Sequence, residues 1–143
     1  MKIATFGVFD LIHEGHVKFL EKCKGLSKDA RLVVVLARDS NVLREKGRKP
    51  LIPEDQRRYI VESLKPVDEA ILGNESSDKL KIVEEIKPDI IVLGYNQGLN
   101  EKNLEEELKK RGLKVRVVRL KKYGNISTSN IKKKMERLKI LEF

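Results

Sequence analysis

Five short apolar segments alternate with amphipathic segments along the chain, and this alternation constrains the fold more strongly than any other feature. The apolar segments lie at residues 2–6, 31–37, 69–72, 89–94 and 114–120. Several of them are continuously apolar, as is typical of strands that are covered on both faces in a parallel sheet. We therefore predict an α/β fold with a doubly wound sheet of five parallel strands and right-handed crossovers.

The segments between the predicted strands show helical periodicity. Helices are predicted at residues 16–26, 53–64, 77–86, 100–111 and 127–138. Pro53 is followed by two acidic residues, as is typical of a first helical turn, and Gly112 suits the position just beyond a helix end. Residues 38–52 form the longest segment without either pattern. We predict an irregular basic loop there, of a kind that is often functional.

Chain length and composition limit the class of protein. A chain of 143 residues has an ordinary single-domain size, so one domain is predicted over residues 1–143. The content of 40% hydrophobic and 37% charged residues favours a globular protein over a disordered one. No apolar run approaches the roughly 20 residues of a membrane span, and the strand at residues 2–6 leaves no room for a signal peptide, so we expect a cytoplasmic protein. Cys23, the single cysteine, falls on the apolar face of the first predicted helix.

The chain is strongly basic, with a formal net charge of +9. This charge has two interpretations, which are attraction to a polyanion such as nucleic acid or a field that gathers small phosphorylated substrates. Basic residues are spread along the predicted helices opposite acidic ones, except in a cluster at residues 132–139. We interpret that cluster as a solvated helix face.

Both histidines of the chain lie in the turn that follows the first predicted strand. They are His13 and His16, on either side of Gly15, in the sequence FGVFDLIHEGHVKFL. In open α/β sheets, ligands bind beyond the carboxyl ends of the strands, and the first strand-to-helix turn commonly contacts a phosphate. Gly7 and Gly15 allow close turns and close approach to a ligand, and the amides that open the next helix favour an anion. We predict that the two imidazoles bind phosphoryl oxygens during a transfer reaction.

Three other roles of the histidine pair are open from the residues alone. A zinc site is disfavoured, because the spacing is not that of HExxH and the chain has no third histidine. Nucleophilic catalysis by histidine is conceivable, although phosphoryl transfer needs mainly positioning and charge stabilisation. A purely structural role is less favoured, because both histidines fall in one glycine-containing turn.

Two motifs resemble the signatures of a known superfamily. Residues 7–20, GVFDLIHEGHVKFL, resemble the G-x-F-D-x-x-H-x-G-H signature of the cytidylyltransferase-like nucleotidyltransferases. Residues 125–131, NISTSNI, resemble the second signature of these enzymes, a turn that precedes the last helix. Within the superfamily, residues 47–73 and 87–97 are similar to the archaeal FAD synthases, and the likeness extends over nearly the whole chain.

The resemblance implies a Rossmann-like fold of the nucleotidyltransferase type and a defined reaction. In such enzymes, a phosphate of the acceptor attacks the α-phosphate of a nucleoside triphosphate, and pyrophosphate leaves without a covalent enzyme intermediate. For this chain, the resemblance implies transfer of AMP from ATP to FMN, which yields FAD. It also implies a divalent metal ion, Mg²⁺ or similar, that arrives with the triphosphate. A homodimer is implied because relatives often form dimers.

The resemblance further assigns roles to individual residues. It implies that His13 and His16 are catalytic and stabilise the charge at the α-phosphate. The implied nucleotide-binding residues are Val8, Phe9, His13, Glu14, Gly15, His16, Asn96, Tyr123 and Ser127. The first two would act through their backbone, and Ser127 would offer its hydroxyl to the outer phosphates while it caps the final helix. No protein ligand to the metal is implied.

Two positions depart from the family pattern, and three residues have simpler interpretations. Val8 stands where threonine is common. Asn96 stands where aspartate is usual, which removes a negative charge and bears on the choice between ATP and CTP.

On local grounds alone, Asp10 braces a turn, Tyr123 is a half-buried aromatic residue, and Ser127 only caps its helix.

Alternatives remain open for the role of several basic residues and for the function of the chain. Lys46, Arg48 and Lys49 form either a solvated loop or an anion site, and at least one of Arg57 and Arg58 is expected at the surface. The main rival function is the same transfer reaction with CTP and glycerol 3-phosphate as substrates. The segment GRKPLIPEDQRR disfavours this rival, but only through its resemblance to the archaeal FAD synthases. The rival from another class is a basic nucleic-acid-binding module. The lack of a known nucleic-acid motif and the aromatic content of 5% argue against it.

Overall fold

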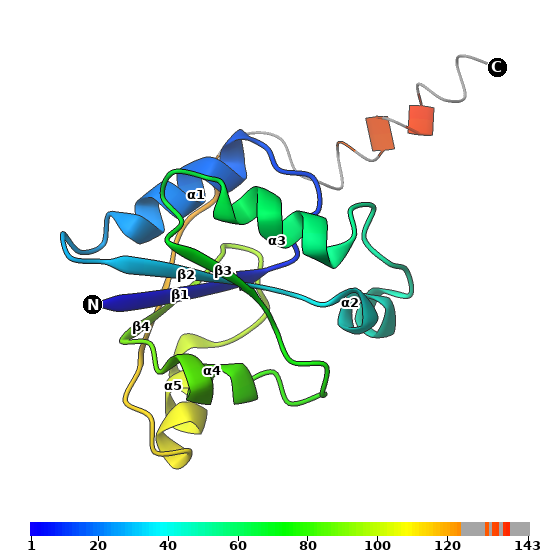
Figure 1. Ribbon diagram of the computed structural model, residues 1–143. Coiled ribbons are helices and arrows are strands. Elements are labelled where there is room, and N and C mark those ends of the chain that lie inside the picture. The colour runs from blue at the N-terminus through cyan, green and yellow to red at the C-terminus, as the bar shows by residue number, and fades with distance from the viewer. Residues whose placement is uncertain (124–130, 132, 135, 138–143) are drawn as a thin grey trace.

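The chain folds around one sheet of five parallel strands in the order β3-β2-β1-β4-β5 (Figure 1). The computed structural model describes residues 1–123, 131, 133–134 and 136–137. The strands are β1 (Lys2–Gly7), β2 (Arg31–Leu36), β3 (Glu69–Leu72), β4 (Ile90–Leu93) and β5 (Arg116–Arg119). The predicted α/β class, the number of strands and their parallel arrangement are confirmed, with small differences at the strand ends.

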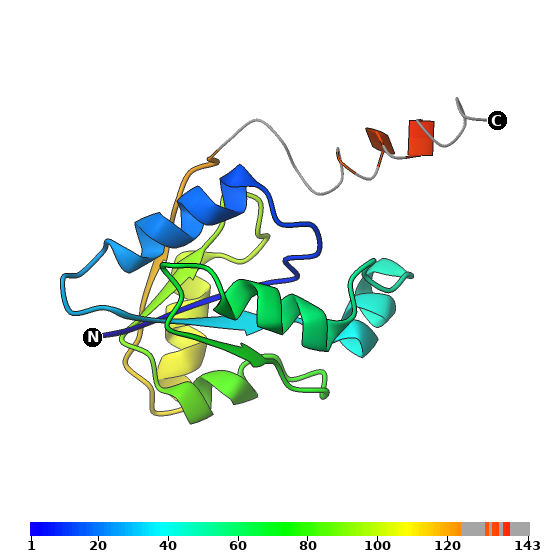
Figure 2. The ribbon, with the colours of Figure 1, turned by 45° about the horizontal axis from the view of Figure 1, so that its top comes forward.

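Helices cover both faces of the sheet. The helices are α1 (Glu14–Lys24), α2 (Asp39–Lys46), α3 (Glu54–Glu62), α4 (Lys81–Ile86) and α5 (Glu101–Lys110). α1 and α3 lie on one face, and α4 and α5 lie on the other, as Figure 1 shows and the rotated view in Figure 2 repeats. α2 lies beyond the carboxyl end of β2. The sheet is therefore doubly wound, as predicted.

Two apolar layers hold the helices against the sheet, and β2 contributes to both. Leu32 and Val34 pack in the layer under α1 and α3, together with Cys23 of α1. Val33 and Val35 pack in the layer under α4 and α5. Fully burying an aliphatic side chain contributes roughly 1.5–3 kcal/mol. The predicted core position of Cys23 is confirmed, and burial raises the pKa of its thiol to about 12.

The order of the strands creates a crevice at the carboxyl end of the sheet. β1 is the central strand, with β2 on one side and β4 on the other. The chain passes from β1 into α1 on one face and from β4 towards α5 on the other face. The two connections therefore diverge, and such a switch point is where ligands bind in open α/β sheets.

The prediction of an irregular loop at residues 38–52 is wrong in its first half. α2 occupies Asp39–Lys46 and ends at Gly47, whose φ of 77° is a left-handed conformation that glycine adopts without strain. The helix buries only Val42, so its sequence lacks the apolar stripe by which a helix is recognised. Residues 47–53 remain an irregular connection.

Two predicted helices begin at other positions in the structure. α1 begins at Glu14 rather than at His16, because the side chain of His13 caps its first turn. Histidine is not among the residues that usually signal a helix start. α4 begins at Lys81, and the residues before it form a turn in which the Asp78 carboxylate accepts a backbone amide hydrogen bond.

The end of the chain is only partly described. The described positions between residues 131 and 137 are helical, in agreement with the helix predicted at residues 127–138. The other positions of that helix, and the NISTSNI motif up to Asn130, lie outside the described residues. Within the described part of the chain, no helix is both long and apolar enough to cross a membrane.

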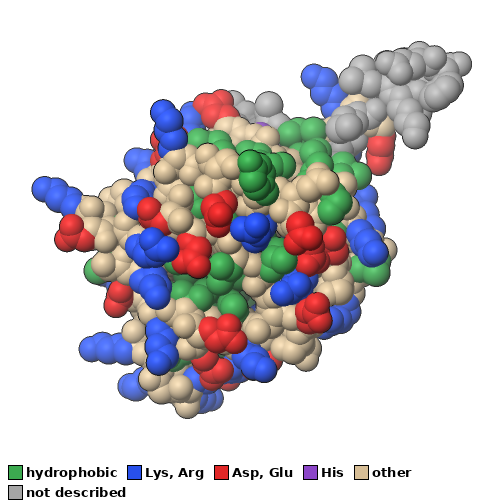
Figure 3. All heavy atoms as spheres, viewed as in Figure 1, with side chains coloured by type: hydrophobic (Ala, Val, Ile, Leu, Met, Phe, Trp, Pro, Cys, Tyr) green, Lys and Arg blue, Asp and Glu red, His purple; other side chains and the backbone are tan. Residues whose placement is uncertain are grey.

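Charged side chains of both signs are mixed on the face shown in Figure 3. Lys and Arg side chains lie beside Asp and Glu side chains across this face rather than in one basic stripe. Ion pairs such as Arg31 with Glu69 at 3.1 Å and Arg111 with Asp78 at 2.9 Å join neighbouring elements at the surface. A nucleic-acid-binding surface needs clustered positive charge, which this face lacks.

Candidate active site

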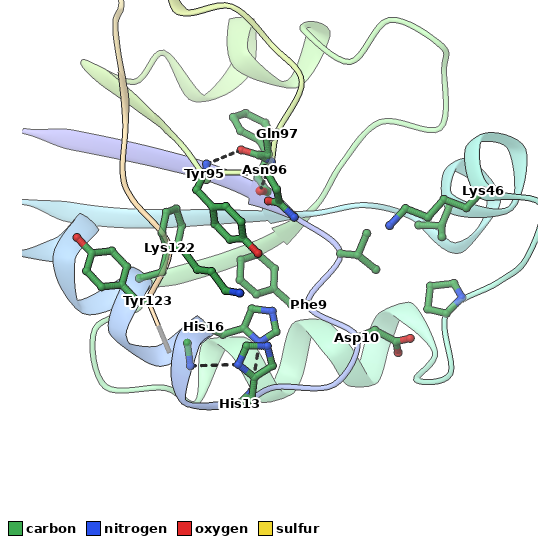
Figure 4. A pocket seen from close by; sticks show the side chains of 18 of the residues that line it. Phe9, Asp10, His13, His16, Lys46, Tyr95, Asn96, Gln97, Lys122 and Tyr123 are labelled. Carbon is green, nitrogen blue, oxygen red and sulfur yellow. Dashed lines mark hydrogen bonds between the residues drawn. The ribbon is translucent and has the colours of Figure 1, made fainter. Parts of the chain in front are cut away.

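The crevice at the carboxyl edge of the sheet holds a cavity of about 640 Å³. Its lining comes from the turn after β1, the start of α1, the end of α2 with the loop beyond it, the loop after β4 and the segment after β5 (Figure 4). The volume lies in the range of roughly 300–1,000 Å³ that is usual for small-molecule sites. Segments that are far apart in the sequence therefore meet around a cavity large enough for a substrate.

The turn after β1 has an uncommon backbone conformation at Phe9. Phe9 has a φ of 51°, in the left-handed region that residues with a side chain rarely adopt, and the residue is 7% exposed. A Cβ atom at Gly7 would lie 2.6 Å from the Phe9 ring, so only glycine leaves room for the ring there. Burial of the ring offsets the backbone strain.

His13 and His16 stabilise the start of α1 through their Nδ1 atoms. The Gly15 amide donates to Nδ1 of His13 at 3.1 Å, and the His13 amide donates to Nδ1 of His16 at 3.2 Å. These reciprocal bonds form a capping box made by two imidazoles. A neutral imidazole carries one N–H group, so these bonds leave the proton of each ring on Nε2. The hydrogen bonds that stabilise the start of α1 therefore also leave two Nε2–H donors, one on each histidine that lines the cavity.

Both imidazoles are held in the neutral form. Their ring centres lie 4.0 Å apart. Burial, followed by repulsion from His13, lowers the pKa of His16 to about 4, and burial also lowers the pKa of His13. At neutral pH, the rings can therefore donate hydrogen bonds without bringing charge of their own. An anion bound between them would favour the protonated form and raise both pKa values.

Gly15 allows the segment after β5 to lie against the start of α1. A Cβ atom at this position would lie 2.4 Å from the carbonyl oxygen of Tyr123 and 2.9 Å from Cε1 of His13. The first of these contacts is with backbone and has little freedom to move away. The structure thus gives Gly15 a packing role beside the predicted close approach to a ligand.

The loop after β4 forms the wall that faces the two histidines. Figure 4 shows Tyr95, Asn96 and Gln97 on the side of the cavity opposite His13 and His16. Tyr95 is 47% exposed, and the ammonium group of Lys122 lies 5.7 Å from the centre of its ring. This distance is suitable for a cation–π interaction. The wall therefore offers aromatic and amide groups, whereas the opposite wall offers imidazole donors.

Two side chains that sequence analysis did not select hold the loop after β4 in place. Gln97 accepts a hydrogen bond from the Gly94 amide at 2.8 Å and donates to the Phe6 carbonyl at 3.0 Å. Arg119 donates to the carbonyls of Gly94 and Gln97 at 2.8 and 2.7 Å, and also to the carbonyl of Leu99. Arg119 lies in a strand pattern far along the chain, so no local signal could have linked it to this loop.

Basic side chains dominate the charge of the cavity. The basic residues of its lining are Lys46, Arg48, Lys49, Lys121 and Lys122. Among the described lining residues only Asp10 is acidic, and it is 5% exposed. Its carboxylate accepts hydrogen bonds from the Leu51 and Ile52 amides at 2.9 and 2.8 Å, so Asp10 joins the turn after β1 to a segment 41–42 residues away, a longer-range role than the local brace that was predicted. The cavity therefore favours anionic ligands.

Arg57 supports the turn after β1 from behind and is fully buried. Its guanidinium donates to the Val8 carbonyl at 2.8 Å and to the Ile52 carbonyl at 2.8 Å, and it pairs with Asp39 at 2.7 Å. The side chain of Arg58 is 37% exposed, which confirms that at least one of the two arginines lies at the surface. The burial of Arg57 was not predicted, because an arginine after a helix start usually faces solvent.

Most of the predicted nucleotide-binding residues meet at this cavity. Those that line it are Val8, Phe9, His13, Gly15, His16, Asn96 and Tyr123. Tyr123 is also partly buried, so both interpretations of this residue agree with the structure. Glu14 is not among the lining residues; its exposed carboxylate pairs with Lys18 at 2.6 Å along α1. Ser127 lies outside the described residues.

The residues that the structure describes contain no group of three His, Cys, Asp or Glu side chains that could hold a metal ion. The Nδ1 atoms of His13 and His16 already accept amide hydrogen bonds, which leaves one nitrogen of each ring for any ligand. Structural zinc sites use four protein ligands, and catalytic ones usually use three. The described part of the cavity therefore does not fit a protein-held zinc ion.

Comparison with known sequences gives long matches at high identity. A sequence model of the Cytidylyltransferase-like family matches residues 4–134. The chain is 53% identical over 133 residues to the FAD synthase of Aciduliprofundum boonei, covering 93% of this chain and 87% of that protein. It is 46% identical over 138 residues to the FAD synthase of Korarchaeum cryptofilum, covering 96% of this chain and 92% of that protein.

Comparison with solved structures agrees with the fold. The lipopolysaccharide core biosynthesis protein from Thermoplasma volcanium matches with a TM-score of 0.80 and 44% identity, over 87% of this chain and 98% of that one. Pantoate-beta-alanine ligase from Francisella tularensis matches with a TM-score of 0.58 over 99% of this chain and 72% of that one, and its identity of 13% shows a likeness of fold alone. Because the family match runs from within β1 through β5 and includes the described cavity lining, this chain belongs to the Cytidylyltransferase-like family.

Proposed function

We propose that this chain is an FMN adenylyltransferase, or FAD synthase, which transfers AMP from ATP to FMN and releases pyrophosphate. The observation that carries the proposal is the identity of 46–53% to archaeal FAD synthases over more than nine-tenths of the chain. The cavity supports it, because basic side chains and two neutral imidazoles line one polar site at the carboxyl edge of the sheet.

In the proposed mechanism, His13 and His16 act as hydrogen-bond donors to the α-phosphate. Their Nε2–H groups would bond to the non-bridging oxygens, whose charge changes as the FMN phosphate attacks and pyrophosphate leaves. Donors held in place before the reaction need no reorganisation, and removal of one such donor typically costs about 10²–10³-fold in rate. Direct attack agrees with phosphoryl-transfer enzymes in which positioning and charge stabilisation do most of the catalysis.

The remaining predicted residues would bind the nucleotide around this centre. The backbone of Val8 and Phe9 would contact ATP, and Asn96 and Tyr123 would make further contacts to it. Glu14 would act through its backbone, since its carboxylate pairs with a neighbouring lysine. Ser127 would contact the outer phosphates. Positive side chains on both sides of the cavity would offset the charge that two phosphorylated substrates bring together.

A divalent ion is part of the proposal and would be held mainly by substrate oxygens. The basic lining and the lack of a metal-binding side-chain group among the described residues suit an ion that enters with the triphosphate. Mg²⁺ commonly binds in this way, with several waters and few protein ligands. Such an ion would neutralise charge on the phosphates. The homodimer implied by the family resemblance also remains a proposal, and sedimentation velocity tests it.

Pyrophosphate release from purified protein tests the proposed reaction. ATP and CTP would each be combined with FMN and with glycerol 3-phosphate, in the presence of Mg²⁺ or of excess EDTA. We expect release with ATP and FMN only, accompanied by formation of FAD, and loss of release in EDTA. Faster release with CTP and glycerol 3-phosphate would replace this proposal by the rival cytidylyltransferase, and no release with any pair would refute both.

A further inference from the structure

A second cavity of about 240 Å³ lies on the face of the sheet that is covered by α4 and α5. Its walls come from the carboxyl ends of β2 and β4, from α4 and α5, and from the loop that follows β3. Most of these walls are aliphatic, with Leu36, Val83 and Leu104 among the lining residues. A cavity of this composition favours an apolar group over a phosphate.

The second cavity adjoins the first across the end of β1. Phe6, Gly7, Val8 and Gln97 line both cavities. A ligand with an anionic end and an apolar ring can therefore place its phosphate on the basic side and its ring on the aliphatic side. The side chain of Gln97 is fixed by two hydrogen bonds to backbone, so this shared boundary is ordered before a ligand binds.

One polar atom at the second cavity has no partner. The Oδ1 atom of Asn74 is buried and, among the described residues, is the only buried side-chain nitrogen or oxygen without a hydrogen bond. Asn74 lines the cavity, and its backbone carbonyl accepts a hydrogen bond from Asn41 at 2.6 Å, which holds the residue in position. Leaving a buried acceptor unpaired destabilises the protein. A ligand that supplies a donor would remove this destabilisation.

We propose that the second cavity binds the isoalloxazine ring of the acceptor and that Asn74 Oδ1 accepts a hydrogen bond from the ring N3–H. The inference rests on the proposed function and adds to it the location and polarity of flavin recognition. The ring system is planar and largely apolar, and its imide edge carries one donor between two carbonyl acceptors. The aliphatic walls match the faces of the ring, and the unpaired amide oxygen matches the donor at its edge.

The first test compares FMN with N3-methyl-FMN, which lacks the N3–H donor. Binding is measured without ATP by the change in flavin fluorescence, for the wild-type chain, Asn74→Leu and the matched control Asn103→Leu, an exposed position on α5. We expect Asn74→Leu to weaken FMN binding about tenfold, as the loss of one buried hydrogen bond does. The wild-type chain and the control should prefer FMN to N3-methyl-FMN, whereas Asn74→Leu should not.

The second test fills the cavity with Ala37→Phe, since Ala37 lines the second cavity and not the first. This variant should lose FMN binding while it still binds a fluorescent ATP analogue, and its thermal unfolding reports whether it folds. If it does not fold, the comparison of the two flavins on Asn74→Leu decides the question alone.

The possible outcomes separate this inference from the proposed function. Wild-type turnover of FMN together with unchanged FMN affinity in Asn74→Leu would overturn the inference and leave the function intact. A wild-type chain that neither binds FMN nor releases pyrophosphate with it would overturn both.

Discussion

The turn after β1 and the loop after β4 form opposite walls of one cavity, but different kinds of contact hold them in place. In the turn, His13 and His16 bond to amides that lie within three residues of them. In the loop, Gln97 bonds to Phe6, which is 91 residues away, and Arg119 bonds to loop carbonyls 20–25 residues away. The histidine-containing end of the first wall is held by its own neighbours in sequence, whereas the second wall is held largely by distant elements. The other end of the first wall has one distant support, because Arg57 donates to the Val8 carbonyl from 49 residues away.

This difference explains why one wall has a recognisable motif and the other does not. A turn stabilised by adjacent residues must contain its donors, acceptors and glycines at fixed spacings, and these appear together in the sequence. A loop held by distant side chains leaves its supports scattered along the chain. We therefore predict that single changes in the first wall alter the rate of the reaction directly. Changes in the second wall should alter substrate binding, because they change the position of the loop after β4.

The largest expected effect tests how far the turn after β1 depends on a side chain that is distant in the sequence. Arg57→Met removes the donors that support the Val8 and Ile52 carbonyls and leaves Asp39 without its buried partner. We expect a loss of about 3–5 kcal/mol in the free energy of unfolding, measured in urea. Arg58→Met, a change of a neighbour whose side chain is 37% exposed, should stay within about 0.5 kcal/mol. Equal stability of both variants would show that Arg57 does not support the turn.

The next effect separates the chemical and structural roles of the first wall. His16→Ala should lower kcat by about 10²–10³-fold, because it removes a donor to the α-phosphate. His16→Asn retains an acceptor near the position of Nδ1 for the His13 amide but lacks the Nε2–H donor. It should fold with a normal melting temperature and be as inactive as His16→Ala. If His16→Asn keeps wild-type turnover, the imidazole is needed only for the turn.

A smaller effect is expected from the support of the second wall. Arg119→Met frees the carbonyls of the loop after β4 and should raise the KM for ATP about tenfold, with a much smaller change in kcat. The steady-state rate against ATP concentration measures both constants. Arg116→Met alters an exposed arginine of the same strand and serves as the control. A fall in kcat at unchanged KM would place the loop in the chemical step instead.

The smallest effect is the pH dependence of stability that comes from His16. Burial lowers its pKa from 6.5 in the unfolded chain to about 4, so the unfolded state takes up a proton first as the pH falls. The free energy of unfolding should therefore be constant above about pH 6.5 and decrease towards pH 4, with a slope below the roughly 1.4 kcal/mol per pH unit of one fully linked proton. His16→Asn should show a shallower slope, and an identical slope would assign the effect to other groups.

The sequence and the structure agree most closely where contacts are local or repetitive. The buried strands were predicted because both of their faces are covered, which makes them continuously apolar. α2 was missed because it buries only Val42 and so has no apolar stripe. The start of α1 was misplaced because an imidazole, rather than a hydroxyl or carboxylate, caps the helix. Each error occurs where the usual sequence signal of a helix is missing.

The sequence by itself determined the class of fold, the number of its strands and the location of the histidine turn, because these depend on periodicity and on residues that are close along the chain. Only the tertiary structure decided which distant side chains complete the site. It buried Arg57 behind Val8, placed Arg119 beneath the loop after β4, and left the Oδ1 atom of Asn74 without a partner beside a second cavity. Contacts of this kind depend on where the chain returns in space, and spacing along the sequence does not record that.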